Sequence, residues 1–468
     1  MPRVGSWAEL RRRILEQIVP REDEVGRIEA FCRRTERALT GRLRDAGIKA
    51  DAEVHGSVAR GTWLSSERDI DIFMVLHEGY GREMLPRVLE VVKEYVGEGW
   101  VEAYAEHPYI SARMEGFNVE FVPCFRVDPG QGLVSATDRT PLHTRYVNEH
   151  LPPDGRDEVR LLKRFMKGVE VYGAEVKVGG FSGYLCELLV IHLGSFESVL
   201  EEASSWRRGE ALDVVGGADT AAPSKFGEPL VVLDPVDRGR NVASAVSETA
   251  FWTLTAAARA FIRGPDEAFF YPREPVFDAP KLLDDIRGRG SGLLFVVLDD
   301  ERADIPDVLW GQLYRTERAL NGLLAKSGFR VFRSAVWSDE STRHIIVFEL
   351  ESAALPGTMK RIGPPVSMQE DSDRFVRAHL GAAETVSGPW IEGGRWWVET
   401  RRPEPSARNL IAETLGDGGA GIGISRKLMR KIGGGYRVLL GEEIGGCLVS
   451  GFSGFLDRFL RGRPAWLG

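Results

Sequence analysis

The chain has 468 residues, too many for one ordinary domain, so several hydrophobic cores are expected. Hydrophobic residues make up 43% and charged residues 28%, which excludes a disordered chain, and no apolar run is long enough to span a bilayer. The formal net charge of -8 excludes a uniformly basic surface for nucleic acid, although a local basic face can coexist with an acidic total.

The first residues lack the apolar core of a secretory signal, so a cytoplasmic protein is expected. Four cysteines lie far apart in the chain with no Cys-x-x-Cys pair. This spacing indicates neither a zinc site nor a disulfide framework. We therefore expect the four to be packing residues: Cys32, Cys124, Cys186 and Cys447.

A small mixed α/β unit is predicted over residues 1–150. Apolar residues with helical spacing occupy 23–46, and an apparent strand follows at 51–55. Strand-like runs at 70–76 and 118–125 flank a helix at 84–95. The overall fold class expected is therefore α+β with several domains.

Helical patterns at 157–166 and 183–200 predict a mostly helical second domain over 151–265, which ends near Gly264-Pro265. The next region, 266–404, is predicted to be a ferredoxin-like β-α-β-β-α-β domain. Its elements are expected at 293–298, 308–327, 330–337, 344–350, 368–380 and 395–400. The Gly-rich remainder, 405–468, is expected to be helical.

Two carboxylates stand out on the strand at 70–76. Asp69 and Asp71 alternate with Ile70 and Ile72, so in a strand both acids leave one face while both isoleucines enter the core. A lone Asp-x-Asp more often marks a solvated strand end. Glu120, on a strand that a Glu-Gly turn precedes, supplies a third acid. Three such acids can hold two Mg²⁺ ions about 3.5–4 Å apart, the arrangement that nucleotidyl transfer requires.

The turn after the strand at 51–55 has the composition of a phosphate site. Gly56 and Ser57 stand where a helix begins, and a helix start offers free N–H groups to phosphates. Ser57 adds a hydroxyl and Arg60 a positive charge. A Gly-Ser pair alone is usually just a helix cap. Its combination with the three acids is much rarer and favours nucleotidyl transfer.

With these residues assembled, the sequence resembles the archaeal-type (class I) CCA-adding enzymes, tRNA nucleotidyltransferases of the polymerase-β-like superfamily. The resemblance runs along nearly the whole chain. Beyond the acids, it is carried by seven blocks: Glu106-His-Pro-Tyr109, Asp138-Arg-Thr-Pro-Leu-His143, Arg160-Leu-Leu-Lys163, Val171-Tyr-Gly-Ala-Glu175, Gly180-Phe-Ser-Gly-Tyr-Leu-Cys-Glu-Leu188, Asp234-Pro-Val-Asp237 with Arg240-Asn-Val-Ala243, and Gly388-Pro-Trp-Ile-Glu-Gly-Gly-Arg-Trp-Trp397.

The resemblance implies a polymerase-β-like catalytic head, a helical neck, a body that binds tRNA and a tail. Metal ligands fall on Asp69, Asp71 and Glu120. In the family the first metal position is often Glu and the third is usually Asp. Here the first position is Asp69 and the third is Glu120, so both positions keep a carboxylate but differ in length. Nucleotide contacts fall on Gly56, Ser57, Arg60, His143, Lys163 and Tyr172, and Arg240 matches a residue that helps to select the base.

Without the resemblance these residues allow plainer interpretations. His143 follows Thr140-Pro141 in an apparent loop and would be a structural histidine. Lys163 would be a cation on a helix surface and Tyr172 a half-buried aromatic, although the two could meet at one triphosphate. Arg240 would be a surface arginine.

The predicted function is addition of C, C and A to the tRNA 3′ end from CTP and ATP, without a template and with release of pyrophosphate. The partners implied are tRNA, ATP and CTP, with no membrane. The oligomeric state stays open, a homodimer included. Two alternatives remain at this point: a poly(A) or oligoadenylate synthase that shares the three acids, and a non-catalytic RNA-binding protein that has kept the fold.

Overall fold

A computed structural model describes residues 7–467 except 105–106, 128–131, 215, 217–224, 274–277, 300–304, 426 and 429–434, so Glu106 of the first block lies outside it. The chain divides into two compact units. One comprises residues 1–273 together with 464–468, and the other comprises residues 274–463.

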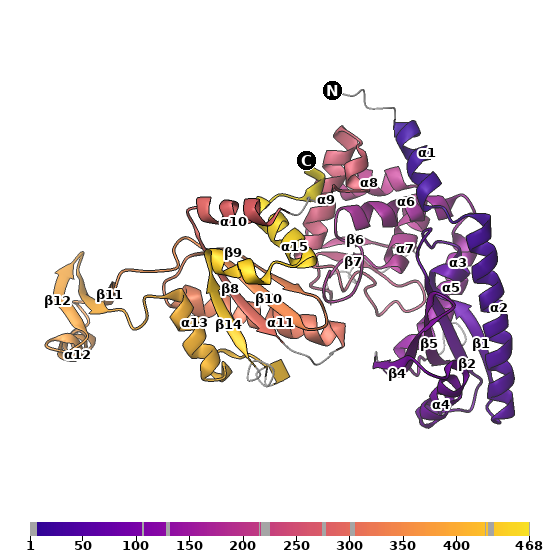
Figure 1. Ribbon diagram of the computed structural model, residues 1–468, viewed down its shortest axis with the longest axis horizontal. Helices are drawn as coiled ribbons and strands as arrows, with labels where there is room; N and C mark the ends of the chain where they lie inside the picture. The colour runs from indigo at the N-terminus through magenta and orange to yellow at the C-terminus, as the bar shows by residue number, and fades with distance from the viewer. Residues whose placement is uncertain are drawn as a thin grey trace. The chain divides into compact units, whose positions relative to one another are not determined.

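A five-stranded sheet begins the first unit, in the order β1-β2-β5-β4-β3 (Figure 1). Only β2 and β5 are parallel. Its strands are β1 (Ala50–His55), β2 (Asp69–Leu76), β3 (Trp100–Tyr104), β4 (Pro108–Met114) and β5 (Phe117–Phe125). The predicted strands at 51–55, 70–76 and 118–125 are thereby confirmed.

Two helices, α2 (Glu22–Asp45) and α4 (Leu85–Val96), cover one face of this sheet and confirm the predicted helices. Ile70 and Ile72 are fully buried in that core. Because side chains alternate along a strand, Asp69 and Asp71 leave the opposite face. Between β4 and β5 the two-residue turn Glu115-Gly116 has φ of 50° and 86°, as a type I′ hairpin requires, and it sets the register of Glu120.

Helices and one small sheet complete the first unit around an aromatic core. Phe165 lies within 6 Å of the ring centres of Phe196, Phe261 and Phe270, which come from three other segments. The elements are α1 (Trp7–Ile18), α3 (Gly56–Arg60), α5 (Arg139–His150), α6 (Gly155–Gly168), α7 (Gly183–Leu193), α8 (Phe196–Ala203) and α9 (Glu248–Arg263), with β6 (Glu210–Leu212) parallel to β7 (Leu230–Val232). Short 3-10 turns lie at Arg82–Met84, Ala136–Asp138 and Glu267–Phe269.

The helix expected at 183–200 is two helices, because Gly194 has a left-handed φ of 93° and Ser195 caps the N-terminus of α8. Within the described part of the chain no single helix has the length and apolar character to cross a membrane. The bent pair α7 and α8, which meet at 95°, passes that test by length and composition together.

A four-stranded antiparallel sheet in the order β14-β8-β10-β9 forms the second unit's centre. This is the strand order of a ferredoxin-like fold. Its strands are β8 (Gly292–Asp299), β9 (Val331–Ser338), β10 (Arg343–Leu350) and β14 (Tyr436–Leu440), with the helices α10 (Ala279–Gly288), α11 (Pro306–Lys326), α13 (Ala407–Gly416) and α15 (Ser450–Arg461).

The elements that complete this fold differ from the prediction. The second helix and the last strand are α13 and β14, not residues 368–380 and 395–400. Those residues belong to a separate three-stranded sheet, inserted after β10, that contains β11 (Thr358–Pro365), β12 (Thr385–Glu392), β13 (Arg395–Arg401) and the helix α12 (Gln369–His379). Both helix-strand pairs match the β-α-β-β-α-β order, but only α13 carries the buried apolar residues Ile411 and Leu415 that a sheet-covering helix needs.

Residues 405–463 are therefore part of the second unit rather than a separate helical region. Alternate residues of β8 enter two cores: Leu294 and Val296 pack with α11 and α13, whereas Phe295 and Val297 pack with α10 and α15. Because both faces of the sheet are covered, β8 is a continuous apolar run.

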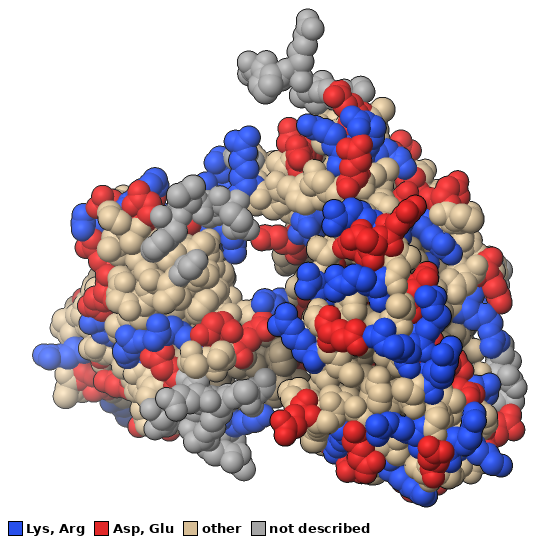
Figure 2. All heavy atoms as spheres, turned by 45° about the vertical axis from the view of Figure 1, so that its right-hand side comes forward, with Lys and Arg blue, Asp and Glu red and all other residues tan. Residues whose placement is uncertain are grey.

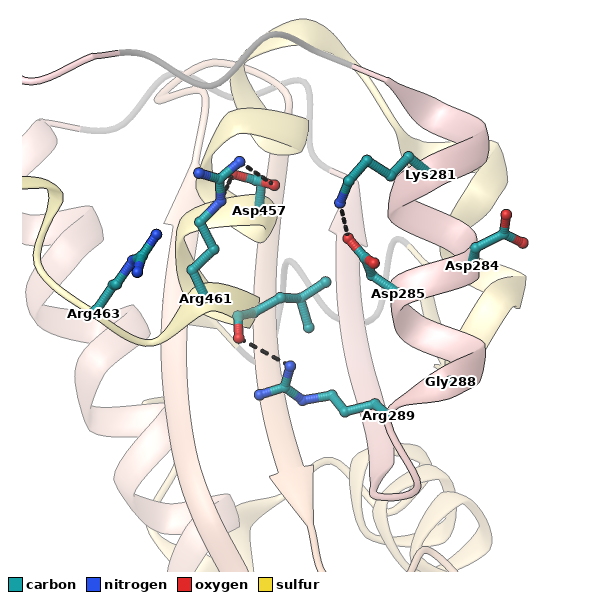
Figure 3. A pocket seen from close by; sticks show the side chains of 9 residues that line it. Lys281, Asp284, Asp285, Gly288, Arg289, Asp457, Arg461 and Arg463 are labelled. Carbon is teal, nitrogen blue, oxygen red and sulfur yellow. Dashed lines mark hydrogen bonds and ion pairs between the residues drawn. The ribbon is translucent and has the colours of Figure 1, made fainter. Parts of the chain in front are cut away.

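A hollow of about 420 Å³ lies between α10 and α15, and charged side chains line it (Figure 3). Lys281 pairs with Asp285 and Arg461 with Asp457, while Arg289 donates to the carbonyl of Leu460 at 2.9 Å. The two ion pairs lie within α10 and within α15, and the Arg289 bond joins the end of α10 to α15.

We expect Phe452→Ala to lower the free energy of unfolding of the second unit by about 3–4 kcal/mol, because Phe452 of α15 is fully buried. Its ring lies 5.3 Å from that of Trp337, so tryptophan fluorescence during urea unfolding reports on the site. The control Phe332→Ala removes a ring that is 52% exposed and should cost under about 1 kcal/mol. Equal costs would contradict the placement of α15 in this core.

Candidate active site

Three carboxylates lie on the face of the first sheet opposite to the one that α2 and α4 cover. In the parallel pairing of β2 with β5, Asp71 stands opposite Glu120 and Asp69 opposite Asn118. Paired positions on neighbouring strands are about 5 Å apart and share a face. Asn118 donates from Nδ2 to Asp69 Oδ1 at 2.9 Å. The three acids predicted from the sequence are thus brought together.

Burial, and then the proximity of the other acids, raises the pKa values of two of them. Burial, together with the negative charges of Asp71 and Asp69, raises the pKa of Glu120 to about 7. Burial also raises the pKa of Asp71, although Arg60 opposes the shift. Carboxylates held this close repel one another, and a divalent cation between them would remove that repulsion.

The donor set fits a cation that keeps water and substrate ligands. Among the described residues no three His, Cys, Asp or Glu side chains enclose a metal position by themselves. Mg²⁺ typically takes only one or two carboxylates and completes its coordination with water and phosphate oxygens. Asp71 and Glu120, which are paired on adjacent strands, can supply those carboxylates, and Asp69 lies on the same face two residues before Asp71.

Gly56 is required by the geometry between β1 and α3. Its φ is 66°, a left-handed value that favours glycine, and a Cβ built there would lie 1.8 Å from Asp71 Oδ2. The backbone of the Gly-Ser turn therefore packs directly against a carboxylate of the site. Ser57 follows, partly exposed, on the five-residue helix α3.

Arg60, at the end of α3, is buried against a carboxylate that the sequence analysis did not select. Its guanidinium lies 2.7 Å from Glu187 Oε2, and its Nε donates to the carbonyl of Gly56 at 2.9 Å. Glu187 is fully buried on α7. Lys163 Nζ lies 3.8 Å from the other carboxylate oxygen of Glu187, and burial lowers the pKa of Lys163. One carboxylate thus balances two cations expected to contact nucleotide.

The segment that follows α3 is held to α6 by hydrogen bonds from α6 side chains to three successive backbone carbonyls. Arg160 donates to the carbonyls of Gly61 at 2.6 Å and Trp63 at 3.0 Å. Lys163 donates to the carbonyl of Thr62 at 3.1 Å, and the Thr62 hydroxyl donates to Glu187. These bonds position α3, and with it Ser57 and Arg60, from helices about a hundred residues further along the chain.

Tyr172 and Lys163 meet, as their spacing allowed, at the start of α7. A Cβ added at Gly183 would lie 3.0 Å from the Tyr172 hydroxyl and 3.4 Å from Lys163 Nζ. Lys163 is only 1% exposed, so it is not the helix-surface cation that its position in the sequence suggested. Glu187 could have been found from the sequence as the only acid in the apolar run Tyr184 to Leu193.

His143 lies in α5 and not in the loop predicted for it. Thr140-Pro141 falls in the first turn of that helix, where proline is tolerated because its missing N–H has no partner to lose. His143 Nε2 lies 2.9 Å from Asp234 Oδ2, and its ring stacks on Tyr184 with centres 3.9 Å apart. Burial lowers the pKa of His143, although Asp234 opposes the shift.

Arg240 reaches the same carboxylate. Its Nη1 donates to Asp234 Oδ2 at 2.8 Å, while its side chain remains 36% exposed. It is therefore anchored at one end rather than an unpaired surface arginine. On the face that Figure 2 shows, basic and acidic side chains are interspersed.

The chain matches three known protein families in succession. Residues 36–143 match the nucleotidyltransferase domain, 157–271 the second domain of tRNA nucleotidyltransferases, and 289–441 the C-terminal domain of CCA-adding enzymes.

Curated relatives cover almost the whole chain. It is 37% identical to a CCA-adding enzyme of Methanothermobacter thermautotrophicus over 96% of this chain and 97% of that one. A CCA-adding enzyme of Pyrobaculum neutrophilum is 41% identical, with 80% and 86% covered. Among solved structures, Cid1 poly(U) polymerase is similar with a TM-score of 0.44 and 15% identity, covering 55% of this chain and 94% of that one.

The raised pKa of Glu120 predicts a pH-dependent effect of Glu120→Gln on metal-free protein. The folded protein holds the Glu120 proton up to about pH 7, whereas an unfolded chain loses it near 4.5, so ionisation between these values destabilises only the wild type. Glu120→Gln should therefore be about 1–3 kcal/mol more stable than wild type at pH 8 and nearly equal at pH 4.5.

Urea unfolding with a chelator at both pH values measures this difference. Saturating Mg²⁺ should reduce or reverse it at pH 8, because the wild-type carboxylate then has a counter-charge. A difference that does not change with pH would contradict the crowding of the three acids.

Glu187→Gln should destabilise the first unit by about 3 kcal/mol, because it leaves two buried cations without a counter-charge while keeping the side-chain shape. Chemical denaturation at neutral pH measures the cost. The control Glu16→Gln breaks an exposed pair with Arg12 and should cost under about 1 kcal/mol. If the two variants cost the same, Glu187 does not balance Arg60 and Lys163.

Proposed function

This chain belongs to the family of archaeal-type (class I) CCA-adding enzymes, and we propose from that premise how its own residues carry out the reaction. The protein is a tRNA nucleotidyltransferase that adds C, C and A to the tRNA 3′ end without a nucleic-acid template. Its reaction depends on a divalent metal. We infer that it works in the cytoplasm, with tRNA, CTP and ATP as its partners.

Asp69, Asp71 and Glu120 are the metal ligands in this proposal, and the metal is Mg²⁺, two ions in all. When bound, Mg²⁺ supplies positive charge to the reacting phosphate and to the attacking oxygen. The observation that carries the proposal is the pairing of Asp71 with Glu120 on adjacent parallel strands, with the pKa of Glu120 raised to about 7. Relative to the usual family pattern, Asp69 is one methylene shorter and Glu120 one methylene longer.

In this proposal the triphosphate is contacted by residues of α3 and by two residues near the start of α7. Ser57 offers a hydroxyl and Gly56 leaves the backbone close to Asp71, while Arg60 supplies charge from a fixed position. Lys163 and Tyr172 converge beside Gly183 behind it. The tRNA 3′ hydroxyl loses its proton to solvent as its oxygen bonds to the α-phosphorus. The bond from that phosphorus to the bridging oxygen breaks, and pyrophosphate leaves with its charge balanced by these residues.

Selection of the base is assigned to Arg240, with His143 beside it, because both share Asp234. Without a template, the protein must offer donors that match cytosine or adenine, and a guanidinium presents a planar fork of them. The second unit, residues 274–463, is proposed to bind the rest of the tRNA.

Asp71→Asn should lower addition of both C and A by about a thousandfold while tRNA binding stays within about twofold, because the acid holds metal rather than tRNA. The assay uses tRNA that lacks CCA, with labelled CTP or ATP offered singly and together. Asp51→Asn, an acid of the same sheet that pairs with Arg126, is the control and should retain activity. Retention of more than a few per cent by Asp71→Asn would remove the metal assignment.

A further inference from the structure

Asp234 is a fully buried carboxylate that accepts four hydrogen bonds. Its Oδ2 accepts from His143 Nε2 at 2.9 Å and from Arg240 Nη1 at 2.8 Å. Its Oδ1 accepts from the backbone N–H of Val236 at 3.1 Å and from the Tyr184 hydroxyl at 3.4 Å. Burial raises the pKa of Asp234, but these hydrogen bonds outweigh it and bring the pKa below its usual value. Asp234 is therefore a charged anchor.

The backbone around Asp234 is closed into a rigid loop. Leu233 bridges to Asn241, and Asp234 N–H donates to the Arg240 carbonyl at 3.1 Å. Arg240 N–H in turn donates to the carbonyl of Asp237 at 2.9 Å. Asp234 and Arg240 are thus the first and last residues of a seven-residue loop. Their backbone hydrogen bond holds the two residues together, and the hydrogen bond between their side chains strengthens this pairing.

Of the four donors on Asp234, only Arg240 keeps a substantial part of its side chain exposed, at 36%. One guanidinium nitrogen is taken by Asp234, and within the described residues the other two have no hydrogen-bonding partner. A guanidinium that is fixed at one nitrogen and free at the others presents its remaining donors in a single plane and direction.

Tyr184 connects this anchor to the phosphate side of the site. Its ring stacks on His143 with an angle of 22° between the planes, and the Arg60 guanidinium lies 5.7 Å from its centre. Asp234 therefore sets His143 and Arg240 on the same framework that carries Arg60, so that the base-facing and phosphate-facing groups keep a fixed relation.

We propose that Asp234 is a specificity-determining positioning residue, which sets the direction of the Arg240 guanidinium so that only cytosine or adenine finds matching donors. This proposal rests on the proposed function of Arg240 in base selection. Asp234 itself does not touch the nucleotide: it acts through Arg240.

The test measures single-turnover incorporation of all four nucleotides onto tRNA that ends before C, C or A. Asp234→Asn keeps the shape of the side chain but loses the charge that binds Arg240. We expect the preference for CTP over UTP to fall about tenfold, the loss of one charge-assisted hydrogen bond. A general loss of folding would slow all nucleotides alike and leave that ratio unchanged.

Asp237→Asn is the matched control. Asp237 lies in the same loop and pairs with Arg139 at 2.9 Å, but its side chain contacts neither His143 nor Arg240. Its nucleotide preference should equal that of wild type. Should Asp234→Asn prove unfolded by thermal melting, Asp234→Glu takes its place, because it keeps the charge and displaces it by one methylene.

Arg240→Lys and the double variant with Asp234→Asn separate the two hypotheses. If Asp234 acts through Arg240, the double variant discriminates no worse than Arg240→Lys alone. If Arg240→Lys blurs the preference and Asp234→Asn does not, the positioning role is overturned while the role of Arg240 stands. If Arg240→Lys leaves the preference unchanged at every position, it is the base-selecting role of Arg240 that fails.

Discussion

The buried ion cluster of Arg60, Glu187 and Lys163 is the constraint on which the rest of the catalytic unit depends. Two cations and one carboxylate sit almost without solvent, and an unpaired charge there would cost several kcal/mol. The cluster is satisfied only when α3, α6 and α7 meet. The sheet that carries Asp69, Asp71 and Glu120 and the helix that carries Lys163 therefore cannot form this site separately.

The same constraint explains why residues 61–63 are held so firmly. Three successive carbonyls accept hydrogen bonds from Arg160 or Lys163, which removes the freedom of the segment between α3 and β2. The Gly56 turn packs on Asp71 at one end of this arrangement, and Arg60 meets Glu187 at the other. The groups proposed to contact phosphate are thereby positioned before substrate arrives, which lowers the ordering cost of binding.

An enzyme that adds C, C and A without a template needs an equally fixed group on the base side, and the loop from Asp234 to Arg240 is the one that we propose for it. A buried charge shared between His143 and Arg240 costs desolvation free energy, which four hydrogen bonds offset. Tyr184 then joins both halves of the site through ring contacts. Rigidity, rather than base pairing, is the available source of selectivity in this arrangement.

Local pattern in the sequence determined three of the five strands of the first sheet, and it determined the side from which Asp69 and Asp71 emerge, because alternate residues of a strand point to opposite faces. The spacing of the acids and the Gly-Ser turn indicated nucleotidyl transfer, because a metal needs carboxylates close together and a phosphate needs N–H and hydroxyl donors beside them. The resemblance to CCA-adding enzymes added the residues that no local pattern singles out, such as Lys163 and Arg240.

Only the tertiary structure decided which elements pair and which charges are buried. Residues 395–400 and 436–440 both look like a last strand, and the choice between them rests on which one hydrogen bonds to β8, a contact that spans more than a hundred residues. His143 was expected in a loop because Pro141 precedes it, yet a proline in a first helical turn costs nothing. Glu187 and Asp234 are ordinary acids in the sequence, and they become anchors only because folding removes water from around them and leaves Arg60, Lys163, His143 and Arg240 as their partners.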